Sequence, residues 1–561
     1  MRRLTLSALA LFGLLLLPAC GGEEIPDGYE DGSPVAEGKA DGFIDSLRAS
    51  APLPADAVLD APLAVLFAPD DPVSTLELTL IEEIAARREA DPAAHEEGEN
   101  PFTIRYAVYN LRNERITDAL IDAAARGVDV QVLIEADQLD PARDYNQMDE
   151  RLIDAGFEYA PDHRALDEGG RREADLIGVT GSGLMHLKTR IFQAPGFEAV
   201  ISGSMNPGDN AVLNEETLHL IRDPALIARY DEAYRAVLED RRVPNVWDEG
   251  AALNVLFTPA ASGPRAGTRL LQWLQEEDEQ ILLMVYSLRD VTAAGVDGSL
   301  VDILKAKAKA GVPVYLITDR KQSDGVDADG NPVYRNDRTE DRLRGAGVHV
   351  YEVTNRATPF TAMHHKVAIL GRTRIRVITD AANYSYAALG SDTRTARNHE
   401  SMLFVDTAAA GLPHLGRRYL GQWMKVLERY ADQSADEDEA PFGVVAAELL
   451  AQAGWPDAPV GFTATAQTEW GESVHVRGDA ERLGAWGERG EGVPLFTDAT
   501  SYPFWTTLED VPLPVGAIFA WKVTAVSESG ATRWEAGPNR RSLAMDACLL
   551  GGGARFHGDW R

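Results

Sequence analysis

The sequence has few cysteines and a deficit of positive charge. Its 561 residues include only two cysteines, Cys20 and Cys548, which excludes a framework of several disulfides. Lysine and arginine number 54 against 88 aspartate and glutamate residues, a formal charge of -34. Extended nucleic acid is bound by basic surface that displaces counterions, so this charge opposes such binding. A local basic pocket for one phosphate stays compatible with it.

One apolar run stands out, from Leu4 to Leu17, directly after two arginines. It is too short to cross a bilayer comfortably and has the composition of a signal peptide. Its end, "LPAC" at Cys20, resembles a bacterial lipobox, which implies cleavage before Cys20 and lipidation of its thiol. Because Gly21 follows, the usual sorting rule sends such a protein to the outer membrane of a two-membrane bacterium. We therefore expect a signal peptide over 1–19 and a lipid-anchored protein of the cell envelope or cell surface. An ordinary secretory signal that happens to end in cysteine is the alternative.

The rest of the chain divides by composition and by repetition. Residues 20–62 are rich in Gly, Pro, Asp and Glu, as is typical of a flexible tether. Residues 63–248 and 249–431 repeat one another, since "LAVLFAPDD", "AVYNLRN" and "VDVQVLIEAD" in the first have the counterparts "LNVLFTPAA", "MVYSLRD" and "VPVYLITDR" in the second. Residues 432–458 are expected to be a linker. Residues 459–561 contain short aromatic strands with frequent Gly and Pro.

The hydrophobic pattern predicts the fold class of these parts. In the first repeat, Ile116, Leu120 and Ile121 recur at helical spacing, and the alternating valines from Val128 to Val132 predict a strand. Strands that alternate with helices predict an α/β layered sheet, and the duplication predicts a pseudo-dimer of two such sheets. The C-terminal region instead predicts a small all-β sandwich.

The motif Met-His-x-Lys occurs once in each repeat, as "MHLK" and as "MHHK". On a strand, residues two apart point to the same face, so His186 lies beside Lys188, and His364 beside Lys366. A lone copy would most often be a solvated strand end. Two copies at matching points of a duplicated unit, each followed by a hairpin that returns an asparagine, favour one active site built from both halves.

These residues resemble the phospholipase D superfamily, whose two His-x-Lys motifs are each followed by an Asp, a Gly-Ser-x-Asn and a later Asn-x-Glu. The resemblance implies a set of catalytic residues: His186, Lys188, Asn206, Glu216, His364, Lys366, Asn383 and Glu400, with Ser204 also matching. The chain departs from the pattern at the Asp, which is Gln193 in one copy and Gly371 in the other, and at the second Gly-Ser, which is Asp380-Ala381. The tyrosyl-DNA phosphodiesterase branch also lacks that Asp.

The chemistry of these residue types fits a phosphodiester. One imidazole attacks phosphorus and forms a phosphohistidine, and the second protonates the leaving alcohol. Lysine and asparagine neutralise the nonbridging oxygens, so we expect no metal and no cofactor. The glutamates orient the imidazoles. The resemblance assigns His186 as nucleophile and His364 as acid, although the residues alone do not order them.

The C-terminal stretches "TEWGESVHVRGDAERLGAW", "WEAGPNR" and "GDWR" resemble the starch-binding carbohydrate-binding module of family 20. That resemblance implies one glucan site at Trp486, Trp534, Lys522 and Asn539, and a second at Trp470 and Tyr502. Indole faces stack on glucose rings, while amide and ammonium groups bond the hydroxyls. Aromatics that only fill the sandwich core are the alternative, and Trp505 is expected there.

Together these features predict a lipid-anchored, metal-independent phosphodiesterase of the phospholipase D type, a hydrolase tethered to starch or a glycogen-like α-glucan. The expected substrate is a phosphodiester, phospholipid first, and the expected contact with the membrane is through lipidated Cys20. A catalytically inactive surface starch-binding protein is one alternative. A phosphodiesterase acting on nucleic acid, which the net charge opposes, or on a phosphorylated glycan is another.

Overall fold

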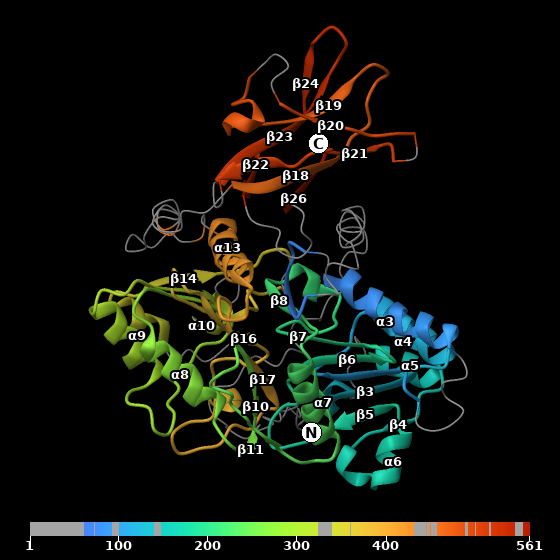
Figure 1. Ribbon diagram of the computed structural model, residues 1–561, viewed down its shortest axis with the longest axis vertical. Coiled ribbons are helices and arrows are strands. Elements are labelled where there is room, and N and C mark those ends of the chain that lie inside the picture. The colour runs from blue at the N-terminus through green and yellow to red at the C-terminus, as the bar shows by residue number, and fades with distance from the viewer. Residues whose placement is uncertain are drawn as a thin grey trace, which may run out of the picture.

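The computed structural model describes residues 61–71, 73–91, 100–139, 147–323, 339–358, 361–430, 433, 445, 449, 457–487, 492–499, 501–514, 518–544 and 554–560 (Figure 1). The expected signal peptide and the tether up to residue 60, Cys20 included, lie outside these ranges, as does nearly all of the expected linker over 432–458. Among the described helices, none combines the length and the apolar character needed to span a membrane.

The first repeat forms a mixed sheet in the order β1-β8-β7-β6-β2-β3-β5-β4. Its strands are β1 (Leu63–Ala68), β2 (Thr103–Val108), β3 (Asp129–Glu135), β4 (Tyr159–Ala160), β5 (Leu176–Val179), β6 (Lys188–Ala194), β7 (Phe197–Gly203) and β8 (Glu216–Ile221). Its helices are α3 (Val73–Ala90), α4 (Glu114–Ala125), α5 (Met148–Asp154), α6 (Glu168–Glu173) and α7 (Pro224–Leu238), with short 3-10 turns η3 (Ala136–Leu139), η4 (His163–Ala165) and η5 (Asn210–Leu213).

The second repeat forms a sheet in the order β10-β17-β16-β15-β12-β13-β14, which follows the order of the first sheet but has one strand fewer. Its strands are β10 (Leu253–Thr258), β12 (Ile281–Val285), β13 (Val314–Asp319), β14 (His349–Val353), β15 (Lys366–Leu370), β16 (Arg376–Asp380) and β17 (Glu400–Asp406). Its helices are α8 (Ala266–Glu276), α9 (Leu300–Lys309), α10 (Arg320–Ser323), α11 (Thr339–Arg344), α12 (Tyr386–Leu389) and α13 (Pro413–Arg429). Two short strands, β9 (Val243–Pro244) and β11 (Ala260–Ser262), pair between the repeats. The duplicated α/β architecture predicted from the repeats is confirmed.

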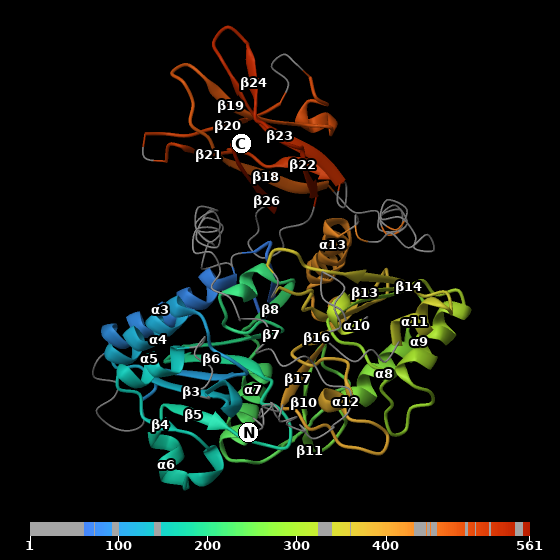
Figure 2. The same cartoon turned by 180° about the vertical axis from the view of Figure 1, so that it is seen from behind.

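The two sheets share one hydrophobic core. Residues of their inner faces, such as Val65 and Leu282, are buried in one cluster with Tyr230 from α7 and Trp423 from α13. The outer face of the first sheet is covered by α3 and α4, and that of the second by α8 and α9 (Figures 1 and 2). Because each sheet is covered on both faces, nearly all residues of central strands such as β6 and β8 are buried, polar ones included. The interface between the repeats is therefore part of the core.

Polar side chains at the N-termini of several helices fix where those helices begin. The side chain of Asn113 accepts a hydrogen bond from the backbone N–H of Ile116 and begins α4, and Asp223 does the same for Leu226 at the start of α7. Ser299 and Asp302 form a reciprocal capping box on α9. These polar groups satisfy backbone donors that would otherwise be left open at the first turn.

The C-terminal region is a β-sandwich of two sheets. One contains β18 (Asp457–Thr465), β21 (Phe504–Thr506), β22 (Val511–Pro514) and β26 (Ala554–Asp559); the other contains β19 (Ser473–Gly478), β20 (Val493–Leu495), β23 (Ile518–Val526), β24 (Thr532–Trp534) and β25 (Arg540–Leu543), and η6 (Glu481–Leu483) follows β19. Phe462, Phe519 and Trp521 pack between the sheets. Trp505 is also buried there, with its indole N–H donating to the Ala466 carbonyl, so its expected core position is confirmed.

Candidate active site

Each His-x-Lys motif begins a central strand at the junction of the two halves. Lys188 and Lys366 are the first residues of β6 and β15. The backbone N–H of His186 donates to the carbonyl of His399 at 3.1 Å, and that of His364 donates to the carbonyl of Glu215 at 3.0 Å. Each motif is therefore bonded through its backbone to the segment that carries the Asn-x-Glu of the opposite half.

The two imidazoles are held by exchanged glutamates. Nδ1 of His186 lies 2.7 Å from Oε2 of Glu400, and Nδ1 of His364 lies 2.8 Å from Oε1 of Glu216. All four side chains are buried. A carboxylate on Nδ1 fixes the tautomer and the ring orientation, so the chemistry of each imidazole falls to Nε2. The sequence indicated that glutamates orient the histidines, but only the structure shows that each half orients the histidine of the other.

The lysines begin strands β6 and β15, whereas His186 and His364 lie two residues before these strands and not on them as predicted. Each ammonium donates to the carbonyl of the histidine two residues earlier, at 3.2 Å for Lys188 and 3.0 Å for Lys366. Both side chains are buried. A buried ammonium strongly favours an anionic partner, and a phosphodiester is such a partner.

Asn206 and Asn383 lie on turns that are hydrogen-bonded to the strands that begin with Glu216 and Glu400. Ser204, two residues before Asn206, receives the backbone N–H of Thr217 on its hydroxyl at 2.8 Å. In the second half, the N–H groups of the two residues before Asn383 donate to the carbonyl of Ser401, at 3.2 and 3.1 Å. Thr217 and Ser401 directly follow Glu216 and Glu400, so each asparagine is tied to the glutamate of its own half.

The two glutamates have different surroundings. Glu216 accepts the hydroxyl of Ser204 at 2.5 Å and the amide of Asn214 at 3.2 Å, in addition to His364. Burial by itself raises the pKa of Glu216, but the charge and hydrogen bond of His364, together with Lys366 and Ser204, outweigh it and lower the pKa. Glu400 accepts the amide of Asn398 at 3.3 Å, and at the place of Ser204 stands Ala381, which has no hydroxyl.

Two tyrosines flank the motifs and were not predicted as site residues. The ring of Tyr109 lies edge-on to His186 with centroids 5.6 Å apart, and Tyr286 lies edge-on to His364 at 4.6 Å. The lysine ammonium lies 5.9 Å from the ring centroid of Tyr109 in the first half and 4.9 Å from that of Tyr286 in the second. Their signal was present in the sequence, because "AVYNLRN" and "MVYSLRD" are paired stretches of the duplication.

Two buried carboxyls also lie at the motifs. Glu135 accepts the backbone N–H of Met185 at 2.5 Å, and Asp319 accepts that of Met363 at 3.0 Å. Burial raises the pKa of Glu135 to about 7 and that of Asp319 to about 6. They end β3 and β13, which are paired by the same duplication, and each fixes the backbone directly before the histidine of a His-x-Lys motif.

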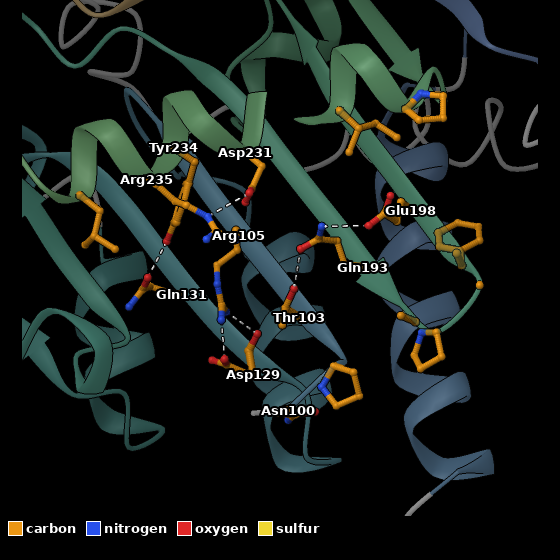
Figure 3. A pocket seen from close by; sticks show the side chains of 18 of the residues that line it. Asn100, Thr103, Arg105, Asp129, Gln131, Gln193, Glu198, Asp231, Tyr234 and Arg235 are labelled. Atoms are coloured by element: carbon orange, nitrogen blue, oxygen red, sulfur yellow. Dashed lines mark hydrogen bonds and ion pairs between the residues drawn. The ribbon is translucent and has the colours of Figure 1, made fainter. Parts of the chain in front are cut away.

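The missing motif aspartate does not touch this site. Gln193 lies near the far end of β6, about 16 Å along the strand from Lys188, and bonds Thr103 at 3.2 Å and Glu198 at 3.3 Å (Figure 3). Gly371 follows β15 with φ +86°, and a side chain there would meet the carbonyl of Arg374 at 2.4 Å. Both departures therefore concern the strand ends remote from the chemistry.

Gln193 lines a cavity of about 1120 Å³ between the first sheet and α7. Several polar side chains that line this cavity bond to one another. Arg105 pairs with Asp129, and the hydroxyl of Tyr234 donates to Gln131 at 2.7 Å (Figure 3). None of the eight predicted catalytic residues lines this cavity.

Within the described ranges, no group of three or more His, Cys, Asp or Glu side chains is arranged to hold a metal ion.

In the sandwich, the first predicted glucan site is assembled around two indoles. Trp486 and Trp534 have ring centroids 6.1 Å apart and planes tilted by 45°. Trp486 has φ +60°, a strained backbone for a non-glycine residue that is typical of functional positions. The ammonium of Lys522 donates to the carbonyl of Gly537 at 2.6 Å, and Asn539 is exposed two residues further along.

The residues of the second predicted glucan site are exposed on neighbouring loops. Trp470 is fully exposed, and Tyr502 is 46% exposed. The hydroxyl of Tyr502 accepts the backbone N–H of Thr468 at 3.1 Å, two residues before Trp470. Large apolar rings that face solvent in this way are available to a ligand.

Comparison with known proteins agrees with this architecture. The family model "Cardiolipin synthase, PLD-like domain" matches residues 101–238 and 270–412, half of the chain, so the chain belongs to this phospholipase D-like family. A second model, "Starch binding domain", matches residues 457–549.

Similarity to individual proteins is partial. The AA13 family lytic polysaccharide monooxygenase A of Aspergillus terreus is 34% identical over 104 residues, which cover 18% of this chain and 25% of the relative. An alpha-amylase of Thermomonospora curvata is 32% identical over 103 residues, covering 18% and 16%. The chain thus spans a quarter or less of these relatives. The structure of phosphatidylserine synthase from Haemophilus influenzae is similar over 74% of this chain and 99% of its own, with 12% identity and a TM-score of 0.44.

Proposed function

We propose that the protein is a metal-independent phosphodiesterase that hydrolyses or transfers a phosphodiester through a phosphohistidine on His186. The observation that carries this proposal is the exchange of glutamates, in which each buried imidazole is oriented by a carboxylate of the other half. Such an arrangement supplies two imidazoles with Nε2 directed to chemistry and two ammonium groups beside them. A protein that only binds glucan has no need of it.

In the first step, Nε2 of His186 attacks phosphorus, and the bond from phosphorus to the leaving oxygen breaks. Protonated His364 gives its proton to that oxygen, so the product leaves as a neutral alcohol. In the second step, neutral His364 takes a proton from water or from an acceptor alcohol, whose oxygen attacks the phosphohistidine. The phosphorus–nitrogen bond breaks and both histidines return to their starting states.

The unequal glutamates support this assignment of roles. Glu216 shares its negative charge with the hydroxyl of Ser204 as well as with His364, so its hold on an imidazolium is weakened. Glu400 has no hydroxyl donor at that place, because Ala381 stands there. We assign release of the proton to His364, whose glutamate has this second donor, and attack on phosphorus to His186.

The groups around the phosphate stabilise charge. Lys188 and Lys366 neutralise the nonbridging oxygens as charge builds on them, and the amides of Asn206 and Asn383 donate to the same oxygens. Preorganised donors in a buried site do this without reorganisation of water, which makes them more effective than the same groups in solution.

The proposed substrate is a phospholipid, and the proposed location is the cell envelope. The family description names a cardiolipin synthase, a phospholipid enzyme. A lipid on Cys20 would keep the chain at a membrane surface. The starch-binding module would hold the same protein to an α-glucan, so that the chemistry takes place where glucan and membrane meet.

The test is a substrate screen with purified protein against phospholipid vesicles, DNA and phosphorylated glucan. His186→Ala and His364→Ala should each abolish turnover without unfolding the chain, and EDTA should leave the wild-type rate unchanged. If either variant keeps near wild-type activity on the preferred substrate, the shared site is wrong. Turnover of DNA or glucan phosphate with none of phospholipid would reassign the substrate.

A further inference from the structure

The turn that carries Asn383 contains an aspartate in a backbone conformation that favours glycine. Asp380 ends β16 with φ +108° and is fully buried. The corresponding residue of the first half is Gly203, with φ +138°, where a side chain would meet the carbonyl of Thr217 at 2.1 Å. A non-glycine residue keeps such a conformation only when its surroundings hold it there.

The surroundings that hold Asp380 come from the opposite half. The hydroxyl of Ser202 donates to Oδ1 at 2.7 Å, and the hydroxyl of Tyr230 donates to Oδ2 at 2.5 Å. Burial and the nearby carboxylate raise the pKa of Tyr230, so it stays protonated and able to donate. His219 lies 3.9 Å from Oδ1, and burial lowers its pKa to about 4, so it is neutral at neutral pH.

The same turn is bonded to the segment that carries Glu400. The N–H groups of Ala381 and Ala382 donate to the carbonyl of Ser401, the residue after Glu400. The residues after Asp380 are thus hydrogen-bonded to the residue after Glu400, and Glu400 in turn contacts His186. Asn383 lies three residues along the same turn.

We propose that Asp380 is a positioning residue that fastens the Asp380–Asn383 turn to Ser202 and Tyr230 of the first half and thereby sets Asn383 and Glu400 for catalysis. This inference rests on the proposed function. It explains why the second copy carries Asp-Ala where the first has Gly-Ser. Glycine would accept the backbone angle but would leave the turn without its bond to the other half.

The test compares Asp380→Gly and Tyr230→Phe with the matched control Tyr234→Phe. Tyr234 lies one turn further along α7 and donates to Gln131 instead. Asp380→Gly and Tyr230→Phe should lower kcat by about tenfold or more with KM changed little, since small misplacements of catalytic groups are felt in the transition state. Asp380→Asn should be intermediate, because its amide oxygen accepts one bond and its NH2 group accepts none. Tyr234→Phe should match the wild type.

A second measurement does not depend on activity. Hydrogen exchange at the amides of Ala381 and Ala382 should be faster in Asp380→Gly and in Tyr230→Phe, and unchanged in Tyr234→Phe. Unaltered kcat and unaltered exchange in folded Asp380→Gly would overturn the inference, and so would equal losses in both tyrosine variants. The wild type could also fail to turn over any phosphodiester while exchange is still faster in the variants. That result would support the role of Asp380 in holding the turn and would refute the proposed function.

Discussion

Changing either exchanged glutamate to glutamine should disable the histidine of the opposite half. Glu400→Gln removes the carboxylate 2.7 Å from Nδ1 of His186, and Glu216→Gln removes the one 2.8 Å from His364. Glutamine keeps the size of the side chain but carries no charge to stabilise an imidazolium, and it does not fix the tautomer. The two variants should differ in kind, because the two histidines have different roles.

The size of each effect follows from those roles. Loss of the carboxylate that orients a catalytic imidazole lowers kcat by about 10⁴ in a serine protease triad, or about 5.4 kcal/mol at 1.36 kcal/mol per tenfold. Glu400→Gln should show a loss of that order with every leaving group, since His186 must attack in all cases. Glu216→Gln affects the acid, which contributes about 10² to 10⁴ only when the leaving oxygen needs a proton.

The assay compares an alkyl phosphodiester with a p-nitrophenyl phosphodiester, whose leaving group departs without protonation. Glu216→Gln should lose about 10² to 10⁴ on the first, and less than about tenfold in the initial burst of p-nitrophenol from the second, because that burst reports the attack of His186 before His364 is needed as a base. Glu215→Gln is the matched control, because its carboxylate contacts Arg429 and Tyr430 rather than an imidazole. If Glu400→Gln, and not Glu216→Gln, were the variant whose activity is restored with the p-nitrophenyl phosphodiester, the roles of the two histidines would be reversed. Equal losses on both substrates for both variants would refute the division into nucleophile and acid.

Three further predictions concern the anchor, the module and the buried carboxyls. Cys20→Ser should abolish incorporation of a palmitate analogue in cells, and equal labelling of both proteins would contradict the lipoprotein assignment. Residues 459–561 alone should bind β-cyclodextrin in a calorimeter, and joint replacement of Trp486 and Trp534 by alanine should remove most of that binding, since stacked aromatics dominate such contacts. No heat from a module shown to be folded by circular dichroism would mean that the aromatics are structural. Burial raises the pKa of Glu135 from 4.5 to about 7, so its ionisation opposes folding and the free energy of unfolding should fall as pH rises through this window. Glu135→Gln should flatten that fall in urea titrations at successive pH values, and an unchanged slope would speak against it.

In the sequence, the difference between the surroundings of Glu216 and Glu400 was visible only as a serine in one repeat and an alanine in the other. Ser204 and Ala381 occupy matching places of the duplication, but the effect of that difference depends on which carboxylate the hydroxyl reaches. Likewise, Tyr109 and Tyr286 were paired by the repeat, yet nothing in a local pattern says that a ring lies against an imidazole. Such contacts depend on packing, which sequence periodicity does not specify.

The sequence by itself determined the duplicated α/β sheets, the strands that begin at Lys188 and Lys366, and the β-sandwich at the C-terminus. These features follow from hydrophobic periodicity and from side-chain alternation, which act over a few residues and recur in both repeats. Only the tertiary structure decided that Glu400 orients His186, that Glu216 orients His364, and that Asp380 is held from the other half. These partners lie 214, 148 and at least 150 residues apart. They meet because the two sheets bury their inner faces in one core, and the geometry of that docking is a property of the whole chain.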